Sequence, residues 1–317
     1  MRRPLTLLLA PVILLIALTS CSRRSPDPNA SGAPGTPTDP VRVVATTGMV
    51  GDLARQIGGD RIALTALMGP GVDPHLYKAT ASDVTALQRA AVVLYSGLHL
   101  EGRMTELLEQ MNSASRRVVA VTSALPPERL RPTDDAGKSH DPHVWFDVAL
   151  WAECTGPVAE ALASADPAHA AAYRERAAAT RARLLELHDW VQQTLAQIPA
   201  ERRILVTSHD AFGYFGAAYG FEVIGLQGIS TVTEAGLADM AKLSDFIRDR
   251  KVPALFVESS VSHATLERIS ADTGVRIGGE LFSDAMGSPG QMEEGYDIGT
   301  YEGMIRHNVN ALLKALR

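Results

Sequence analysis

Histidine and aspartate side chains occur in four loops of this 317-residue chain where a bound ligand is expected. The loops span residues 69–77, 139–147, 207–215 and 281–287. They carry, in the same order, His75, His143, His209 and Asp284. Three imidazoles and one carboxylate form a ligand set for a divalent first-row transition metal. Calcium and magnesium would require more oxygen ligands.

The same residue types also have ordinary structural interpretations. Asp284 could cap the turn that follows it, and Asp210 could cap a helix beginning at Ala211. Asp73 precedes Pro74 and is typical of a turn. Single histidines in or beside expected helices, or away from these loops, are treated as ordinary: His99, His169, His188, His263 and His307.

Two further residues bear on the candidate site. His140 comes three residues before His143, and we assign it to solvent. Glu258 ends an expected strand, where it could orient a ligand histidine. A helix cap or a surface carboxylate is an equally good interpretation of Glu258, so it stays outside the expected ligand set.

The loops belong to a chain in which strand and helix patterns alternate. Strands are expected at 41–47, 61–68, 91–96, 117–121, 204–208, 221–226, 254–258 and 275–281. Helices are expected at 50–57, 82–89, 102–111, 147–163, 234–250, 264–273 and 299–316. Continuous apolar strands alternating with helices indicate parallel sheets covered on both faces. Such sheets bind ligands beyond the carboxyl ends of their strands, and loops that follow the expected strands are therefore the candidate ligand-binding segments.

A long helix separates the two groups of strands. Asp166 is a suitable N-cap, Pro167 fits the first helical position, and no Gly or Pro occurs from Ala168 to Ile198. One apolar stripe runs through Tyr173, Ala177, Thr180, Leu184, Leu187, Val191, Leu195 and Ile198. Such a helix would be roughly 45–48 Å long. An ordinary surface helix is the alternative, but its place between the strand groups favours a connection between two lobes.

The sequence therefore predicts an α/β protein of two parallel-sheet lobes joined by a single long rigid α-helix. The expected lobes are 41–165 and 199–317, with the helix at 166–198. Residues 21–40 are rich in Pro, Ser, Gly and Ala, which is typical of a flexible tether.

The first twenty residues have the pattern of a signal peptide. Arg2 and Arg3 precede a short apolar run that ends in Leu-Thr-Ser-Cys, which resembles a bacterial lipobox with Cys21 as the lipidated residue. An ordinary secretory signal is the alternative. The other cysteine, Cys154, is expected to be small and buried, so no disulfide is expected. These features predict an extracytoplasmic protein anchored to a bacterial membrane by lipid.

The charge of the chain bears on its partners. Removing residues 1–20 takes away Arg2 and Arg3, so the formal net charge changes from −6 to −8. A mildly acidic protein argues against binding to nucleic acid or to an anionic membrane surface.

Several segments, arriving in order from about Val43 to the C-terminus, resemble the TroA-like family of zinc/manganese ABC transporter solute-binding lipoproteins. They are GVDPHLYKATASDVTAL, LYSGLHLE, DPHVWFD, VTSHDAFGYFGAAYG, GISTVTEAG and LFSDAMG. The resemblance implies two α/β lobes on one long helix and metal ligands at His75, His143, His209 and Asp284. It also implies a cognate ABC permease and its ATPase as partners, and we expect a monomer.

The resemblance also bears on the identity of the ion. Family members that favour manganese or iron commonly have Glu where this chain has His209. The chain lacks the His-rich loop of many dedicated zinc carriers, since only His140 occurs between Thr122 and Asp141. We therefore expect one Zn²⁺ or Mn²⁺ ion as the transported ligand.

The predicted function is capture of a divalent metal for an ABC importer, with no catalysis. A siderophore- or haem-binding lipoprotein is one alternative, but it would need a wide aromatic cleft and only 5% of residues are aromatic. A periplasmic zinc hydrolase is another, although the sequence has no HExxH, G-x-S-x-G or P-loop motif. Because imidazole binds metal only when neutral, we expect affinity to fall below about pH 6.5.

Overall fold

The computed structural model describes residues 39–111, 113, 116–133 and 139–317, and residues 39–317 form one compact unit. The expected signal peptide, Cys21 and nearly all of the tether lie outside the described residues. Within the described part, no helix combines the length and apolar character needed to cross a membrane.

The first lobe is built on a four-stranded parallel sheet. Its strands are β1 (Val41–Ala45), β2 (Ile62–Ala66), β3 (Val92–Tyr95) and β4 (Arg117–Ala120), in the order β2-β1-β3-β4. Its helices are α1 (Gly48–Gly58), α2 (Ala81–Arg89), α3 (Met104–Gln110), α4 (Val148–Glu153) and α5 (Thr155–Ala165). Alternate residues of β1 face opposite sides, with Val43 and Ala45 packed toward α1 and Val44 toward α2 and α3.

The second lobe repeats this arrangement. Its strands are β5 (Ile204–His209), β6 (Glu222–Gln227), β7 (Leu255–Glu258) and β8 (Ile277–Leu281), all parallel in the order β6-β5-β7-β8. Its helices are α7 (Gly213–Tyr219), α8 (Leu237–Arg250), α9 (Ala264–Thr273) and α10 (Tyr301–Leu316). A small antiparallel hairpin, β9 (Met292–Glu293) and β10 (Tyr296–Asp297), precedes α10. Both sheets therefore have the same strand order.

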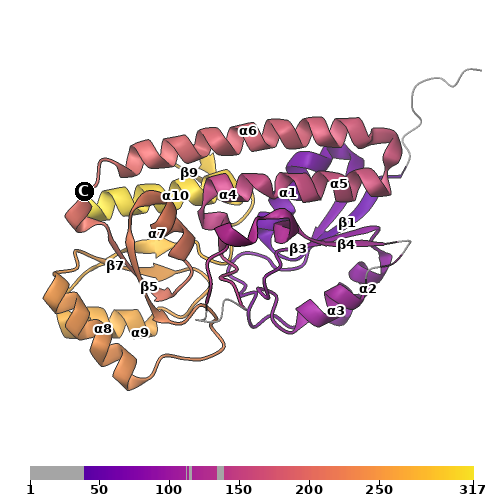
Figure 1. Cartoon of the computed structure of the whole chain (residues 1–317). Coiled ribbons are helices and arrows are strands. Elements are labelled where there is room, and N and C mark those ends of the chain that lie inside the picture. The colour runs from indigo at the N-terminus through magenta and orange to yellow at the C-terminus, as the bar shows by residue number, and fades with distance from the viewer. Residues whose placement is uncertain (1–38, 112, 114–115, 134–138) are drawn as a thin grey trace, which may run out of the picture. The chain divides into compact units, whose positions relative to one another are not determined.

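The long helix α6 (Ala170–Leu195) extends along both lobes (Figure 1). It packs on α1, α4 and α5 on one side and on α7 and α10 on the other. All eight residues of the predicted apolar stripe are buried. The fold class predicted from the sequence is thus confirmed, while the exact lobe boundaries stay a prediction.

The ends of α6 differ from the prediction. The helix begins at Ala170, after a 3-10 turn at Pro167–His169, and it ends at Leu195, so its length is about 39 Å. The Asp166 carboxylate does not cap the helix. Asp166 Oδ2 accepts a hydrogen bond from Tyr173 Oη at 2.9 Å and also lies 2.9 Å from His169 Nδ1. At the other end, Ile198 N–H bonds to the carbonyl of Leu195, which tightens the last turn.

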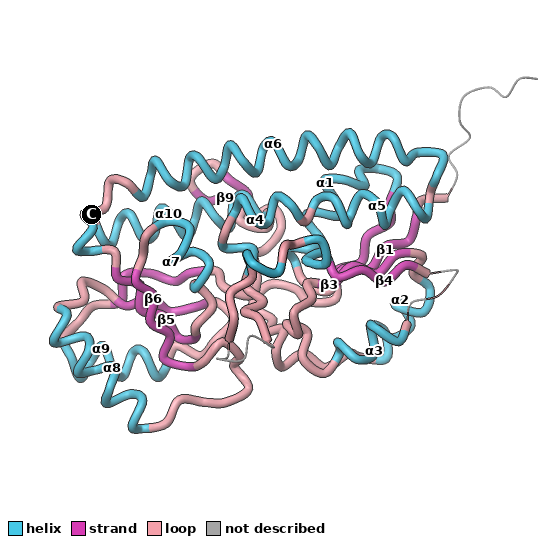
Figure 2. Tube along the Cα trace, in the orientation of Figure 1, coloured by secondary structure: helices cyan, strands magenta, loops and turns pink. Residues whose placement is uncertain are grey.

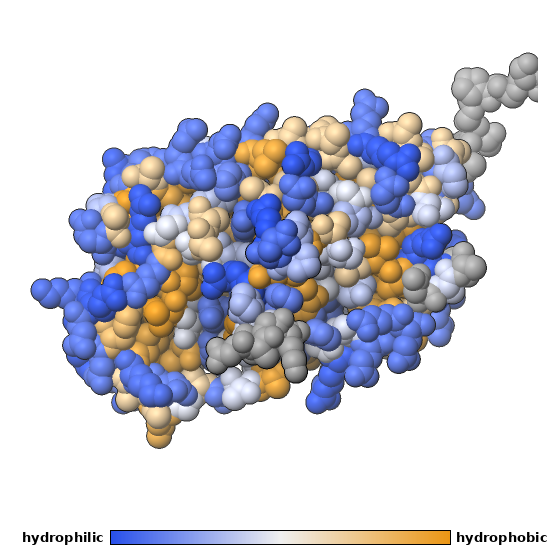
Figure 3. All heavy atoms as spheres, viewed as in Figure 1, coloured by the Kyte–Doolittle hydropathy of each residue, from blue (hydrophilic) through white to orange (hydrophobic). Residues whose placement is uncertain are grey.

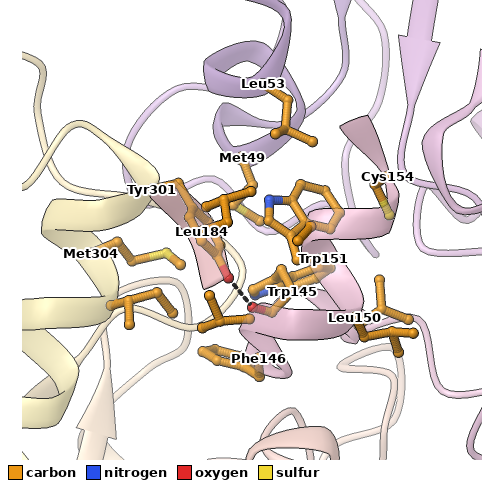
Figure 4. Packing of buried hydrophobic residues seen from close by; sticks show 14 of the residues in the cluster. Met49, Leu53, Trp145, Phe146, Leu150, Trp151, Cys154, Leu184, Tyr301 and Met304 are labelled. Atoms are coloured by element: carbon orange, nitrogen blue, oxygen red, sulfur yellow. Dashed lines mark hydrogen bonds between the residues drawn. The ribbon is translucent and has the colours of Figure 1, made fainter. Parts of the chain in front are cut away.

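The apolar core is continuous on the α6 side of the molecule. One cluster of buried residues includes β1 and β3 of the first sheet, the inner face of α6, and Phe256 and Leu281 of the second sheet. Figure 4 shows part of this cluster, where Trp145, Leu184 and Tyr301 meet and Tyr301 Oη donates to the Trp145 carbonyl at 2.6 Å. The outer faces of the two sheets have separate clusters under α2 and α3 and under α8 and α9.

Two local features were not predicted. The helix expected at 147–163 is interrupted at Cys154, which is buried as expected, so α4 and α5 are separate. The β9–β10 hairpin is too short to show a strand pattern. Contacts that involve α10 and α6 hold the hairpin in place. The Arg306 guanidinium of α10 lies 4.4 Å from the ring of Tyr296 in β10 and 4.3 Å from the ring of Trp190 in α6.

The face of the molecule seen in Figure 3 is mainly polar. Hydrophilic residues cover most of the face in Figure 3, and apolar surface is limited to patches, one of them near β6. Figure 2 shows that loops occupy the space between the two groups of strands. The four candidate ligands belong to these loops or to the strand ends that lead into them.

Candidate metal centre

The structure brings the four predicted ligand residues into one buried cluster. His75 lies in the loop between β2 and α2, and His143 precedes the 3-10 turn Val144–Phe146. His209 is the last residue of β5, and Asp284 follows β8. Their exposed fractions are between 0 and 7%, so all four are shielded from solvent.

The four side chains direct ligand atoms toward a common point. Asp284 Oδ1 lies 3.3 Å from His143 Nε2, while Oδ2 lies 3.2 Å from His209 Nε2 and 3.7 Å from His75 Nε2. The Nε2 atoms of His75 and His143 are 3.4 Å apart. Ligand bonds of about 2.0–2.2 Å in a tetrahedral site place neighbouring ligands about 3.4 Å apart. The cluster therefore has the dimensions of a site for one transition-metal ion.

Unpaired polar atoms in the cluster support the same conclusion. Within the described residues, both carboxylate oxygens of Asp284 and Nε2 of His209 are buried without a hydrogen-bond partner. Buried polar groups without partners are costly, because they lose their hydrogen bonds to water. A cation bound among the three imidazoles would satisfy these acceptor atoms, so the residues fit a metal ion.

Neighbouring secondary structure fixes the position of Asp284. The Phe282 N–H donates to Asn308 Oδ1 of α10 at 2.9 Å, and Asn308 Nδ2 donates to the Phe282 carbonyl at 2.7 Å. The Trp145 indole of the first lobe donates to the carbonyl of Ser283 at 3.1 Å. The loop bearing Asp284 is therefore held by both lobes.

Two buried carboxylates orient two of the histidines. Asp141 Oδ1 lies 2.8 Å from His143 Nδ1, and Glu258 Oε2 lies 2.5 Å from His209 Nδ1. With Nδ1 facing a carboxylate, Nε2 is free to face the metal. Glu258 is fully buried, so its interpretation as a surface carboxylate was wrong. The strand register explains its position: Val206 pairs with Leu255, and three residues further along the two strands lie His209 and Glu258.

Sequence reasoning did not single out Asp141, although a signal was present. The tripeptide Asp-Pro-His occurs twice, at 73–75 and 141–143. In both copies an Asp oxygen accepts the backbone N–H of the His two residues later, at 2.8 Å in the first and 3.0 Å in the second. Each Asp therefore shapes the turn that presents the ligand.

Burial and charge shift the pKa values of the four residues in different directions. Burial lowers the pKa of His143, but contact with Asp141 and Asp284 outweighs it and raises the value to about 9. For His209 burial also lowers the pKa, yet the charges of Glu258 and Asp284 raise it well above its usual value. For His75 burial dominates and lowers the pKa. Burial raises the pKa of Asp284, but the neighbouring histidines hold it well below its usual range.

The other candidates lie outside the cluster. His140 is half-buried and does not join it, and Asp210 does not cap α7, which begins at Gly213 without a side-chain cap. Asp73 is part of a turn, as expected. The side chains of four of the histidines treated as ordinary have partners elsewhere, for example Glu293 for His307 and Tyr219 Oη for His188.

Comparison with known proteins places this arrangement in a family. The family described as zinc-uptake complex component A, periplasmic (ZnuA), matches residues 43–315. The chain belongs to this family.

Individual members of the ZnuA family are similar over nearly their whole length. The manganese-binding lipoprotein MntA of Bacillus subtilis is 43% identical over 316 residues, which cover 98% of this chain and 99% of MntA. The zinc-binding protein TroA of Treponema pallidum is 46% identical over 279 residues, covering 86% of this chain and 88% of TroA. The solved structure of the periplasmic zinc-binding protein TroA from Treponema pallidum superposes with a TM-score of 0.82 and 45% identity, over 88% of this chain and 99% of that one.

Proposed function

We propose that this protein captures one divalent transition-metal ion outside the cytoplasm and delivers it to an ABC importer. The proposed ligands are His75, His143, His209 and Asp284. The observation that carries the proposal is the buried Asp284 carboxylate, which faces three imidazole Nε2 atoms and has no hydrogen-bond partner among the described residues. Family membership supports the same function, since its named members bind manganese or zinc.

The proposed cargo is zinc or manganese. Three nitrogen ligands and one carboxylate favour Zn²⁺ over Mn²⁺ in affinity, following the general order of divalent metals. Affinity alone does not identify the ion transported in the cell, because supply also decides which ion is loaded. We propose that Zn²⁺ binds more tightly and that Mn²⁺ competes for the same ligands.

Capture and release follow from the division of the ligands between the lobes. His75 and His143 come from the first lobe, and His209 and Asp284 come from the second. The ion is bound when the two pairs meet, and the cognate permease would release it by separating them. The continuous core along α6 limits this separation to a small motion. We further propose that the protein is a monomer and that a lipid on Cys21 anchors it to the membrane.

The alternative functions fit the site less well. Since the four ligand atoms lie within 4.8 Å of one another, the cluster has room for an ion but not for haem or a siderophore. A catalytic zinc site needs an open coordination position, and four protein ligands would occupy the usual four.

Metal content tests the proposal directly. We would measure it by elemental mass spectrometry on residues 22–317, followed by zinc and manganese competition. We expect one equivalent of metal, lost or much weakened in His209→Ala and retained in the matched control His140→Ala. A chain that binds neither ion, or a His209→Ala variant that binds as tightly as wild type, would contradict the proposed site. Ester or peptide turnover by the loaded protein would instead favour a hydrolase.

A further inference from the structure

A loop of the second lobe contacts the loop that bears His75. The loop between β6 and α8 covers residues 228–236, and its sequence is GISTVTEAG. Within it Thr231 is the one buried residue, with 7% of its surface exposed, while the next residue, Val232, is 66% exposed. The loop is thus at the surface, and Thr231 is its one buried residue.

The partner of that side chain is on the other lobe. Thr231 Oγ1 donates a hydrogen bond to Asp73 Oδ2 at 2.6 Å. The other oxygen of the same carboxylate, Asp73 Oδ1, accepts the backbone N–H of His75 at 2.8 Å. One carboxylate therefore connects the loop of the second lobe to the backbone of a proposed ligand on the first. We call this arrangement the Asp73–Thr231 clasp.

His75 depends on its backbone for its position more than the other histidines do. His143 and His209 each have a buried carboxylate behind Nδ1. Among the described residues, no hydrogen bond reaches Nδ1 of His75. Its backbone is confined by Asp73 on one side and by Gly102 on the other, where an added Cβ would lie 2.8 Å from the His75 carbonyl oxygen.

The position of the clasp also differs from that of the other contacts between the lobes. Near α6 the lobes meet through buried aromatic contacts, such as Phe146 stacked on Phe212 at 4.2 Å and Tyr301 bonded to Trp145. Those contacts belong to the continuous core and resist separation. The clasp joins two loops outside that core, so the lobes can separate there with the loss of little apolar contact.

We propose that Thr231 is a positioning residue for His75, and that its hydrogen bond to Asp73 slows release of the bound ion. The inference rests on the proposed metal-binding function and identifies where the site opens. Ion release requires His75 to leave the ion, and the clasp couples that step to separation of the lobes. Thr231 does not touch the ion, so its effect is transmitted through Asp73.

The test compares zinc dissociation rates, measured by stopped-flow mixing of loaded protein with excess chelator. Thr231→Val keeps the shape of the side chain and removes the donor, whereas Thr231→Ser keeps the donor. A hydrogen bond to a carboxylate is strong enough that we expect dissociation about tenfold faster in Thr231→Val. We expect Thr231→Ser, and the control Thr233→Val at an exposed position of the same loop, to stay within about twofold of wild type.

Two further measurements separate positioning from general stability. Far-ultraviolet circular dichroism of the metal-free protein should be the same in wild type, Thr231→Val and Thr231→Ser, so that faster dissociation does not reflect loss of the fold. In an Asp73→Ala background, Thr231→Val should cause no additional acceleration, because the partner is already absent. Equal dissociation rates in wild type and Thr231→Val, or an acceleration that persists in the Asp73→Ala background, would overturn the inference. If wild type itself binds no zinc, the proposed function fails instead, so the two failures are distinct.

Discussion

At the scale of single residues, carboxylates influence the protonation of two of the proposed ligand histidines in the metal-free protein. Asp141, Glu258 and Asp284 favour the protonated forms of His143 and His209, although burial alone would favour the neutral forms. A metal ion needs neutral imidazole, so it must displace these protons. In the proposed site, Asp141 and Glu258 would then hold the neutral rings with Nε2 toward the ion. The carboxylates therefore lower the apparent metal affinity, because protons must be released on binding, but they also position the imidazole rings for binding.

The first prediction concerns pH. Because the pKa of His143 is raised from its usual 6.5 to about 9, apparent zinc affinity should keep rising with pH up to about 9, well above the 6.5 expected from an unperturbed imidazole. The stability of the metal-free protein should change with pH in the opposite direction. Protonation of His143 stabilises the metal-free fold, and this contribution is fully present below about pH 6.5 and is lost as the pH rises through about 9. Chelator competition from pH 5.5 to 9.5 measures the affinity. An affinity that is constant above pH 7 would contradict the assignment.

The second prediction concerns Glu258. Glu258→Gln keeps the size of the side chain but weakens its hold on His209, and we expect zinc affinity to fall about 10- to 100-fold. The exposed Glu267→Gln on α9 is the matched control and should bind as wild type does. Competition with a chromogenic chelator gives both values. Unchanged affinity in Glu258→Gln would mean that β5 and β7 alone hold the histidine in place.

The residue types and their loops made the four members of the cluster predictable. Imidazole and carboxylate groups at the carboxyl ends of expected strands are a chemical signal in the sequence itself. The partner of His209 was not predictable with the same certainty, because it depends on β5 lying beside β7. That adjacency follows from the packing of strands that are far apart in the chain.

At the scale of elements, α6 is the support shared by both lobes. Its buried stripe contacts helices of each lobe, so its packing stabilises the relative position of the two pairs of proposed ligands. The stripe was predictable because apolar side chains must recur with the helical period. The ends were not, because Asp166 bonds to Tyr173 and contacts His169 instead of capping the helix, a choice that depends on tertiary contacts.

The third prediction concerns the stripe of α6. Leu184 is buried near Trp145 and Tyr301 (Figure 4), and Leu184→Ala should destabilise the protein by about 2–5 kcal/mol through the cavity it leaves. The exposed Glu186→Ala should change stability by less than about 0.5 kcal/mol. Urea unfolding of both variants measures the difference. A small effect at Leu184 would show that the neighbouring side chains collapse into the space.

At the scale of the whole molecule, two sheets share one core. The sheets have the same strand order and separate outer clusters, but a single cluster of buried residues joins them beneath α6. The two lobes are therefore expected to unfold together. This coupling could not be predicted from the sequence, since Tyr301 and Trp145 are 156 residues apart and nothing in their local patterns indicates that they meet.

The fourth prediction follows from the shared core. Thermal unfolding followed by tryptophan fluorescence, which reports on the first lobe and α6, should coincide with unfolding followed by far-ultraviolet circular dichroism. Free zinc at about 1,000 times the dissociation constant should shift the single transition upward, equivalent to about 4 kcal/mol. Two transitions that separate when zinc is removed would contradict a shared core.

The even division of the ligands has a consequence for recognition by other proteins. In the proposed site each lobe contributes two ligands, so a bound ion would act as a cross-link whose length depends on the ionic radius and the coordination bonds. We therefore expect the spacing between the outer loops of the two lobes to differ between the loaded and the empty protein. A receptor that measures this spacing at the surface can distinguish the two states, and even two ions of unequal size, without contacting the metal.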